Sequence, residues 1–433
     1  MIDFSKIKGV ILIITLLFTG NSIKAQMEMH LSLDSAKLYA LEHNKNLMNA
    51  GLAVDEAGQR LREAIAQGLP QIDASLDYSN FFGSTATLGA MPGFEITFSP
   101  TSNLSLSVGQ LIFSGSYIVG VRTARLLTEI SEVGLERSEQ EIKAQIAQAY
   151  HIALISMKSR YFIEANLENM HDVLVKTRAM VDAGIADELD YDQLNVQANM
   201  LENALSGAER QVVMAVNMLR LQMGVDSGTE IILTDNLEDI VTSSDFQRSI
   251  ATRFSVNENL DFQIMQLQKA VSGKQVDLQR AAYLPTVMGF YNYTEKLMKP
   301  EFDIQPKHVI GLNVSIPIFS SGLRQARVNQ ARINLQITEN QMDLLTEQLM
   351  IQEVQLRFNL NNAIEQYESQ QANVEVAQRV FENIRLKYQQ GLLSSLDLTS
   401  ANNNYLQAES SYISSMLQLL DAQVELDKLL NDI

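Results

Sequence analysis

Four segments of the chain carry the short-period pattern of β-strands. Residues 71–79, 103–109 and 309–319 alternate apolar and polar side chains, and residues 286–295 do so less regularly. Successive side chains of a strand point to opposite faces, so this period predicts one apolar and one polar face. Such strands are typical of a half-buried sheet, but each also has about the ten residues that a tilted strand needs to cross a bilayer. Four strands cannot close a water-holding barrel, so the membrane interpretation requires several chains to share one.

A much longer pattern lies between Arg324 and Tyr388, where the chain has no Gly or Pro. A helix of about 65 residues would be roughly 100 Å long at 1.5 Å per residue. Its apolar residues form two heptad-spaced stripes on nearly opposite sides: Leu335, Met342, Leu345, Leu349, Leu356 and Ala363 on one, and Ile337, Leu344, Ile351, Val354 and Phe358 on the other. Two opposed stripes predict a wall of helices, in which each helix has a neighbour on both sides.

The second half of the chain repeats the first. The stretches Asp182–Glu202 and Gln389–Glu409 align at a shift of 207 residues and share Gly, Leu, Asp, Asn and Glu at equivalent positions. In each half, Leu-Pro precedes one extended segment and Ile-Phe-Ser follows another. Coiled-coil composition alone does not explain a shared order of unlike elements. We expect two structural repeats, residues 26–224 and 253–433, each with a helix, two strands and a long helical hairpin.

A linker and a leader complete the predicted organisation. Residues 225–252 lie between the repeats and hold a short strand candidate, Glu230–Thr234. At the N-terminus, Lys6 and Lys8 precede an apolar run that is too short to span a bilayer. This pattern predicts a signal peptide over residues 1–25, with an uncleaved membrane anchor as the alternative.

Composition narrows the classes of function. The chain has no cysteine, and its five histidines are scattered without the spacing of metal ligands. A formal net charge of −18 argues against nucleic acid, because phosphate binding requires a basic face. The Walker loop, GxSxG and HExxH motifs are absent from the sequence. We therefore expect no metal, no cofactor and no enzymatic activity.

Taken together, these features resemble the TolC-like outer-membrane efflux family. The resemblance rests on the leader, the tandem repeat, Leu-Pro before a strand, Pro-Ile-Phe-Ser-Ser-Gly after one, and two Gly-x-x-x-x-Leu-Asp turns. It covers essentially the whole chain after the leader. The fold it implies is mainly α-helical with membrane β-structure: in a homotrimer, each chain gives four strands to one outer-membrane β-barrel and its helices to a long periplasmic α-helical barrel.

The resemblance also implies a function and partners. The trimer would be the exit duct of a tripartite efflux or type I secretion system, seated in outer-membrane lipid and extending into the periplasm. It would act as a passive conduit, working with a periplasmic adaptor (a membrane fusion protein) and an inner-membrane pump. The cargo is not specified, because pumps for different solutes share such ducts.

In this family the glycine turns are the periplasmic tips of helical hairpins. Position by position, the resemblance implies a gate at Asp190, Asp397 and Tyr388 and adaptor contacts at Gly184, Ile185, Gly391 and Leu392. Three copies of an aspartate around an axis would form an anionic ring that favours cations. The best-known members have an arginine and a second aspartate where this chain has Leu393 and Ser400. The charged clamp of those members is therefore not carried over.

The residues themselves give the tip aspartates a structural role as well. Glycine can take the left-handed conformation that ends a helix. Asp187-x-x-Asp190 and Ser394-x-x-Asp397 then match the spacing of capping boxes that restart one. Capping and gating are compatible, and both interpretations stay open.

Two other classes of function are weighed against the duct. A periplasmic coiled-coil adaptor or structural protein predicts helices with one apolar stripe and strands that never touch lipid. An enzyme requires a constellation of catalytic side chains, and the tip aspartates and scattered histidines do not form one.

Overall fold

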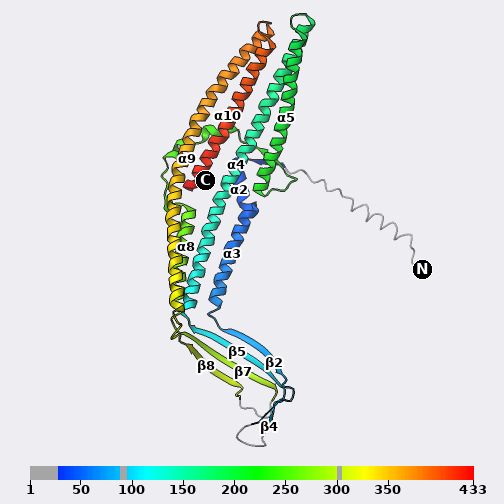
Figure 1. The fold of residues 1–433 in the computed structure, drawn as a ribbon. Coiled ribbons are helices and arrows are strands. Elements are labelled where there is room, and N and C mark those ends of the chain that lie inside the picture. Colours follow the sequence, from blue (N-terminus) through cyan, green and yellow to red (C-terminus); the bar gives the residue numbers. More distant parts are fainter. Residues whose placement is uncertain (1–27, 88–94, 300–304) are drawn as a thin grey trace, which may run out of the picture. The chain divides into compact units, whose positions relative to one another are not determined.

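The computed structural model describes residues 28–87, 95–299 and 305–433 (Figure 1). The predicted signal peptide lies outside the described residues. In chain order the elements are β1 (Glu28–Leu31), α2 (Leu33–His43), α3 (Lys45–Ala66), β2 (Gln71–Ser79), β3 (Thr85–Thr87), β4 (Glu95–Thr97), β5 (Thr101–Phe113), α4 (Gly115–Asp182), α5 (Glu188–Met223), β6 (Glu230–Leu233), α6 (Leu237–Ser243), α7 (Phe246–Ala251), the 3-10 turn η1 (Val256–Glu258), α8 (Leu260–Ala281), β7 (Thr286–Met298), β8 (His308–Ser315), α9 (Leu323–Gln389) and α10 (Ser395–Leu430).

The chain divides into two compact units, which we describe separately. The tip unit contains Met1–Asn44, Ile142–Phe246 and Asn362–Val424, and the sheet unit contains Lys45–Glu141, Gln247–Asn361 and Glu425–Ile433. Each unit takes parts of both predicted repeats, because α4, α9 and α10 run from one unit into the other. The mainly helical fold with four longer strands is as predicted.

In the sheet unit, four strands form one antiparallel sheet in the order β2-β5-β7-β8 (Figure 1). One row across it contains Ile72, Val108, Tyr291 and Ile310, which lie directly opposite one another. Opposite residues share a face, so the predicted alternation places apolar side chains together. That face is uncovered in the single chain: Ile72 is 66% and Ile310 84% exposed.

The strand prediction was wrong at one end. The apolar–polar alternation continues to Phe319, but β8 ends at Ser315. Pro317 lacks the backbone N–H that a further ladder bond requires. A small additional hairpin, β3 paired with β4, lies in the loop after β2 and was not predicted.

The long helix prediction is confirmed in both repeats. The helix α9 has 67 residues and α4 has 68. The first apolar stripe of α9 packs within the sheet unit, where Leu349 joins Phe262 and Leu429 in a buried cluster. The second stripe is uncovered: Ile337, Leu344, Ile351, Val354 and Phe358 are between 48% and 68% exposed.

The tip unit contains a two-stranded parallel sheet, β1 paired with β6. Strand β6 confirms the predicted strand candidate, and its partner β1 was not predicted. The backbone N–H of Leu33 donates to Asp235 Oδ2 at 2.7 Å, and the Tyr150 hydroxyl donates to the Leu31 carbonyl at 2.9 Å. The first bond ties the first described residues to the linker between the repeats, and the second ties them to α4.

Within the described residues, none of the helices combines the length and apolar character needed to cross a membrane.

Candidate functional site: the helical tips

Both hairpins of the tip unit turn in the same way. Gly184 and Gly391 have φ angles of 72° and 71°, in the left-handed region that favours glycine. The N–H of Ile185 donates to the Met180 carbonyl at 2.8 Å, and the N–H of Leu392 donates to the Lys387 carbonyl at 3.0 Å. Each of these bonds spans five residues, as in the Schellman motif that ends a helix. Both tips therefore require glycine because the turn needs a positive φ angle at that position.

The next helices restart on the predicted capping boxes. In the first hairpin, the backbone N–H of Asp187 donates to Asp190 Oδ2 at 3.3 Å. In the second, the N–H of Ser394 donates to Asp397 Oδ2 at 3.1 Å, and the N–H of Asp397 donates to Ser394 Oγ at 3.2 Å. These bonds satisfy N–H groups that a helix start leaves without intrahelical partners. The capping role of both aspartates is confirmed.

A buried core joins the two hairpins just behind the turns. It contains Leu194 and Leu201 of α5, Phe381 and Tyr388 of α9, and Leu398 of α10, with further residues of α4. The five named side chains are each less than 5% exposed. The two hairpins therefore pack as one body near the tips, and separating them exposes apolar surface.

Tyr388 lies inside this core. Its hydroxyl is 2.9 Å from Thr177 Oγ1, and Thr177 donates its own proton to the Val173 carbonyl at 2.9 Å. A threonine hydroxyl has one proton, so Tyr388 is the donor toward Thr177. Burial raises the pKa of Tyr388, with a smaller contribution from Asp190, so the phenol stays neutral and remains a donor.

A second link between the hairpins involves Asp190. Its Oδ1 accepts from Ser395 Oγ at 2.5 Å, and Gln193 Oε1 lies 2.8 Å from the same hydroxyl. The serine has one proton to donate, which the carboxylate takes as the stronger acceptor. The Gln193 amide then fits better with its nitrogen toward Ser395, since amide orientation follows the hydrogen-bond network. Asp190 thus caps its own helix and binds the neighbouring hairpin.

Asp397 differs from Asp190 in facing solvent without a contact to the other hairpin. The Ser394 side chain and then the Ser394 backbone hold the pKa of Asp397 below its ordinary value of 3.8. The carboxylate is therefore charged at neutral pH. Beside the turns, Ile185 is 68% and Leu392 67% exposed, so each tip presents one apolar side chain to solvent.

Three tip residues were missed by sequence reasoning. Thr177 and Ser395 form the links described above, and Arg178 pairs with Glu188 at 2.8 Å while its guanidinium lies over the Tyr191 ring. Ser395 follows the capping serine directly, and only the folded tip shows that it faces the other hairpin. Arg178 lies one turn before Asp182, a helical ion-pair spacing that could have drawn attention to it.

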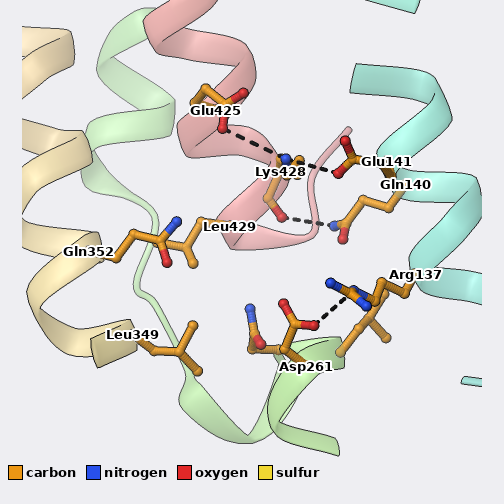
Figure 2. Close-up of a pocket in the computed structure, with 11 residues that line it drawn as sticks. Arg137, Gln140, Glu141, Asp261, Leu349, Gln352, Glu425, Lys428 and Leu429 are labelled. Carbon is orange, nitrogen blue, oxygen red and sulfur yellow. Dashed lines mark hydrogen bonds and ion pairs between the residues drawn. The ribbon is translucent and has the colours of Figure 1, made fainter. Parts of the chain in front are cut away.

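A separate polar pocket in the sheet unit surrounds the end of α10 (Figure 2). Its volume is about 200 Å³. Lys428 pairs with Glu141 at 3.0 Å, and Arg137 pairs with Asp261 at 2.8 Å. In Figure 2 the basic and acidic side chains of each pair point toward one another. The charges of each pair therefore compensate each other. The pocket therefore anchors α10 against α4, and none of the predicted gate or adaptor residues lines it.

Comparison with known proteins gives this architecture its family. The model of the family described as "Outer membrane efflux protein" matches residues 39–225 and 255–432. The chain belongs to this family. It is 24% identical over 441 residues to the proteases secretion protein PrtF of Dickeya chrysanthemi, covering 97% of this chain and 91% of that protein. It is 22% identical over 395 residues to the outer membrane protein TolC of Salmonella enteritidis, covering 88% and 78%.

Solved structures of outer membrane channels share the fold. The CmeC channel of Campylobacter jejuni superposes with a TM-score of 0.79 at 16% identity, covering 92% of this chain and 85% of that one. This outer membrane efflux protein is thus a channel of the bacterial outer membrane with a periplasmic extension. It is a transport protein and not an enzyme, as the sequence predicts.

Proposed function

We propose that this outer membrane efflux protein works as a homotrimer whose three chains share one β-barrel. The edge strands β2 and β8 have no second neighbour in the described part of the chain. Joining β8 of one chain to β2 of the next satisfies both edges and closes a ring of strands. Lipid would then cover the apolar side chains that the single chain exposes, such as Ile72 and Ile310.

The observation that carries this proposal is the uncovered second stripe of α9. Five apolar residues remain exposed along one side of a helix whose opposite stripe packs, buried or partly buried, against the rest of the chain. In the tip unit, α5 similarly exposes Val196, Met200, Met214 and Leu221. A continuous apolar stripe of this kind calls for a second helix. The periplasmic adaptor alternative predicts one stripe and does not account for the second.

The tips are the proposed gate, with Asp190, Asp397 and Tyr388 as its residues. Tyr388 and Asp190 hold the two hairpins of one chain together through Thr177 and Ser395. In a trimer, three copies of Asp397 would form one anionic ring at the narrow end. Opening requires the hairpins to move, after which solute diffuses through the duct.

The tip surface is the proposed contact with a periplasmic adaptor. Gly184 and Gly391 form the turns, and the exposed Ile185 and Leu392 supply matching apolar contacts on the two hairpins. Six such tips in a trimer would present a regular ring to the adaptor, which links the duct to an inner-membrane pump. The two matched family segments, residues 39–225 and 255–432, also support the division into repeats at 26–224 and 253–433 with a linker at 225–252.

The test is the oligomeric mass of protein extracted from isolated outer membranes in mild detergent. We expect a trimer for the intact protein. Ile351→Glu places a charge in the uncovered stripe and should reduce the trimer fraction at least several-fold, because burying an unpaired carboxylate is costly. Gln348→Glu adds the same charge on an exposed polar face of α9 and should leave the trimer intact. A monomer from the intact protein, or equal trimer fractions in both variants, contradicts the proposal.

A further inference from the structure

In the sheet unit, the ends of four helices that lie nearest the strands are rich in basic side chains. The helices α3 and α8 end, and α4 and α9 begin, where the chain enters or leaves the strands (Figure 1). The ten residues of each helix nearest the sheet contain eight basic side chains: Arg60, Arg62, Arg122, Lys274, Arg280, Arg324, Arg327 and Arg332. The same forty positions contain two acids, Glu63 and Asp277. We call these eight side chains the basic collar.

This concentration runs against the charge of the chain, which is −18. Three collar residues have acidic neighbours: Arg60 pairs with Glu56, and Lys274 and Arg280 pair with Asp277. Among the described residues, no carboxylate lies within ion-pair distance of the other five collar arginines. Arg62, Arg122, Arg327 and Arg332 are exposed, so their charge is available to a partner.

The four helix ends lie close together. The Tyr117 hydroxyl of α4 donates to the Ile65 carbonyl of α3 at 3.0 Å. A side chain at Gly115 of α4 would collide with Leu284, which follows α8. Arg324 of α9 donates to the Pro317 carbonyl and lies over the Tyr283 ring. At 1.5 Å per residue, ten helical residues span about 15 Å, so the collar is a narrow band of positive charge.

An apolar belt lies between the collar and the strands. The connecting residues 67–70, 282–285 and 316–322 contain no charged side chain. Their apolar residues are exposed, including Leu69, Tyr283, Leu284, Ile318 and Phe319 at between 44% and 91%. An exposed apolar and aromatic belt followed by Arg and Lys is the pattern of a boundary between lipid and water.

We infer that the basic collar binds the phosphate groups of anionic phospholipids in the periplasmic leaflet of the outer membrane. Arginine is suited to this role because its planar donors grip phosphate oxygens in pairs. A groove of about 510 Å³ between α8 and α9 is lined by Gln275, Gln279, Gln330 and Asn334 around the charge of Arg327. Its amides can hydrogen-bond a polar headgroup while Arg327 holds the phosphate. The collar thereby fixes how deep the strands sit in the bilayer.

This inference rests on the outer-membrane location and not on the trimer, so the two can fail separately. Arginine keeps its charge over the whole working pH range, so lipid binding should not change with pH. It should weaken in high salt, because exposed charges are screened within about 10 Å at 0.1 M.

The test is lipid retention by the full-length protein in mild detergent, measured by native mass spectrometry. Delipidated protein is mixed with phosphatidylglycerol, with zwitterionic phosphatidylcholine or with phosphatidylglycerol plus inorganic phosphate. The collar variant Arg62→Gln, Arg122→Gln, Arg327→Gln is compared with Arg210→Gln, Arg379→Gln, Lys387→Gln, which removes three exposed charges from the tip unit. We expect the collar variant to retain less than half the phosphatidylglycerol of the control, with phosphatidylcholine unchanged.

Other outcomes overturn the inference. Equal phosphatidylglycerol retention in the two variants removes the collar as a lipid site. A changed ion selectivity of the channel with unchanged lipid retention places these arginines in the lumen. Equal loss of both lipids in the collar variant assigns binding to the apolar belt alone. Phosphate that competes as well as lipid at equal concentration indicates a free-anion site. Replacing the same three arginines by lysine keeps the charge but loses the paired contacts, so it should restore part of the retention. This partial rescue separates a binding defect from a folding defect.

Discussion

At the residue scale, the tips combine the two roles that the sequence left open. Asp190 caps α5 through one carboxylate oxygen and accepts from Ser395 of the other hairpin through the second. Asp397 keeps only the capping role within its own chain. The two aspartates occupy equivalent positions of the repeat, but only Asp190 binds the other hairpin. This difference depends on Ser395, whose position in the first repeat is taken by Glu188.

Ser395→Ala should loosen the link between the two hairpins. The variant keeps the helix but removes the proton that Asp190 accepts, leaving a buried contact unpaired. We expect the open fraction of single channels in planar bilayers to rise several-fold. Ser400→Ala removes an exposed serine from the same helix and is the control. Identical conductance records for the two variants would show that this link does not hold the gate.

The capping boxes and the glycine turns could be predicted from the sequence, because both depend on residues within five positions of each other. The partners Thr177 and Ser395 could not. They lie about 200 residues from Tyr388 and Asp190 along the chain, and their contacts arise from the packing of two hairpins. The sequence indicated which residues form the tips and did not indicate what joins them.

At the element scale, helices were predicted more accurately than strands. The absence of Gly and Pro between Arg324 and Tyr388 placed α9 to within one residue at each end. Strand β1 was missed because it has four residues and pairs with β6, about 200 positions away. Local propensity carries little information about such a pair. The predicted strand 309–319 is longer than β8 for a local reason. Its alternating pattern continues through Pro317, which cannot donate a ladder hydrogen bond.

Gly224 gives an element-scale prediction at the end of α5. Its φ is 75°, and a Cβ there would lie 2.4 Å from the His43 carbonyl oxygen. Gly224→Ala should destabilise the protein by about 1–2 kcal/mol from the left-handed backbone alone, and by more because of the collision. The measurement is the thermal unfolding of purified protein, with a lower midpoint expected. Gly228→Ala meets no atom within 4 Å and should unfold like the parent; equal midpoints for the two variants contradict the prediction.

At the scale of the whole molecule, one chain exposes the surfaces that an assembly would cover. The apolar sheet face, the open edges of β2 and β8 and the second stripe of α9 are each unusual for a soluble monomer. The sequence predicted the apolar sheet face and the second stripe through its periodicity. It did not predict which strands form the open edges, because periodicity carries no strand order. The number of chains cannot be derived from periodicity, because any closed ring covers the same surfaces.

In the proposed trimer, the carboxylate of Asp397 is one of three around the channel axis, so its effect on ion permeation depends on the assembly. A ring of three carboxylates should favour K⁺ over Cl⁻, and Asp397→Asn should move the permeability ratio at least twofold toward one. The pKa of Asp397 lies below 3.8, so the selectivity should persist above pH 4 and decline as the pH falls below that value. The capping bonds of Asp397 also stabilise the folded protein at neutral pH, and this contribution to the free energy of unfolding is lost as the carboxylate is protonated at low pH. Reversal potentials in a KCl gradient check both statements.

The control for that measurement is Asp192→Asn, which removes an exposed carboxylate near the other tip. A ratio that falls equally in both variants would indicate general surface charge and not a ring. A ratio at pH 7 that Asp397→Asn leaves unchanged would assign the selectivity to groups other than Asp397.

The unpaired edges of β2 and β8 also have a genetic consequence. If every barrel needs both edges of each of three chains, a chain that joins a ring but cannot complete the duct disables its intact partners. In a cell making equal amounts of intact and defective chains, random assembly leaves about one trimer in eight fully intact. Point changes at the tips should therefore be dominant over the wild-type allele, whereas changes that abolish folding should be recessive.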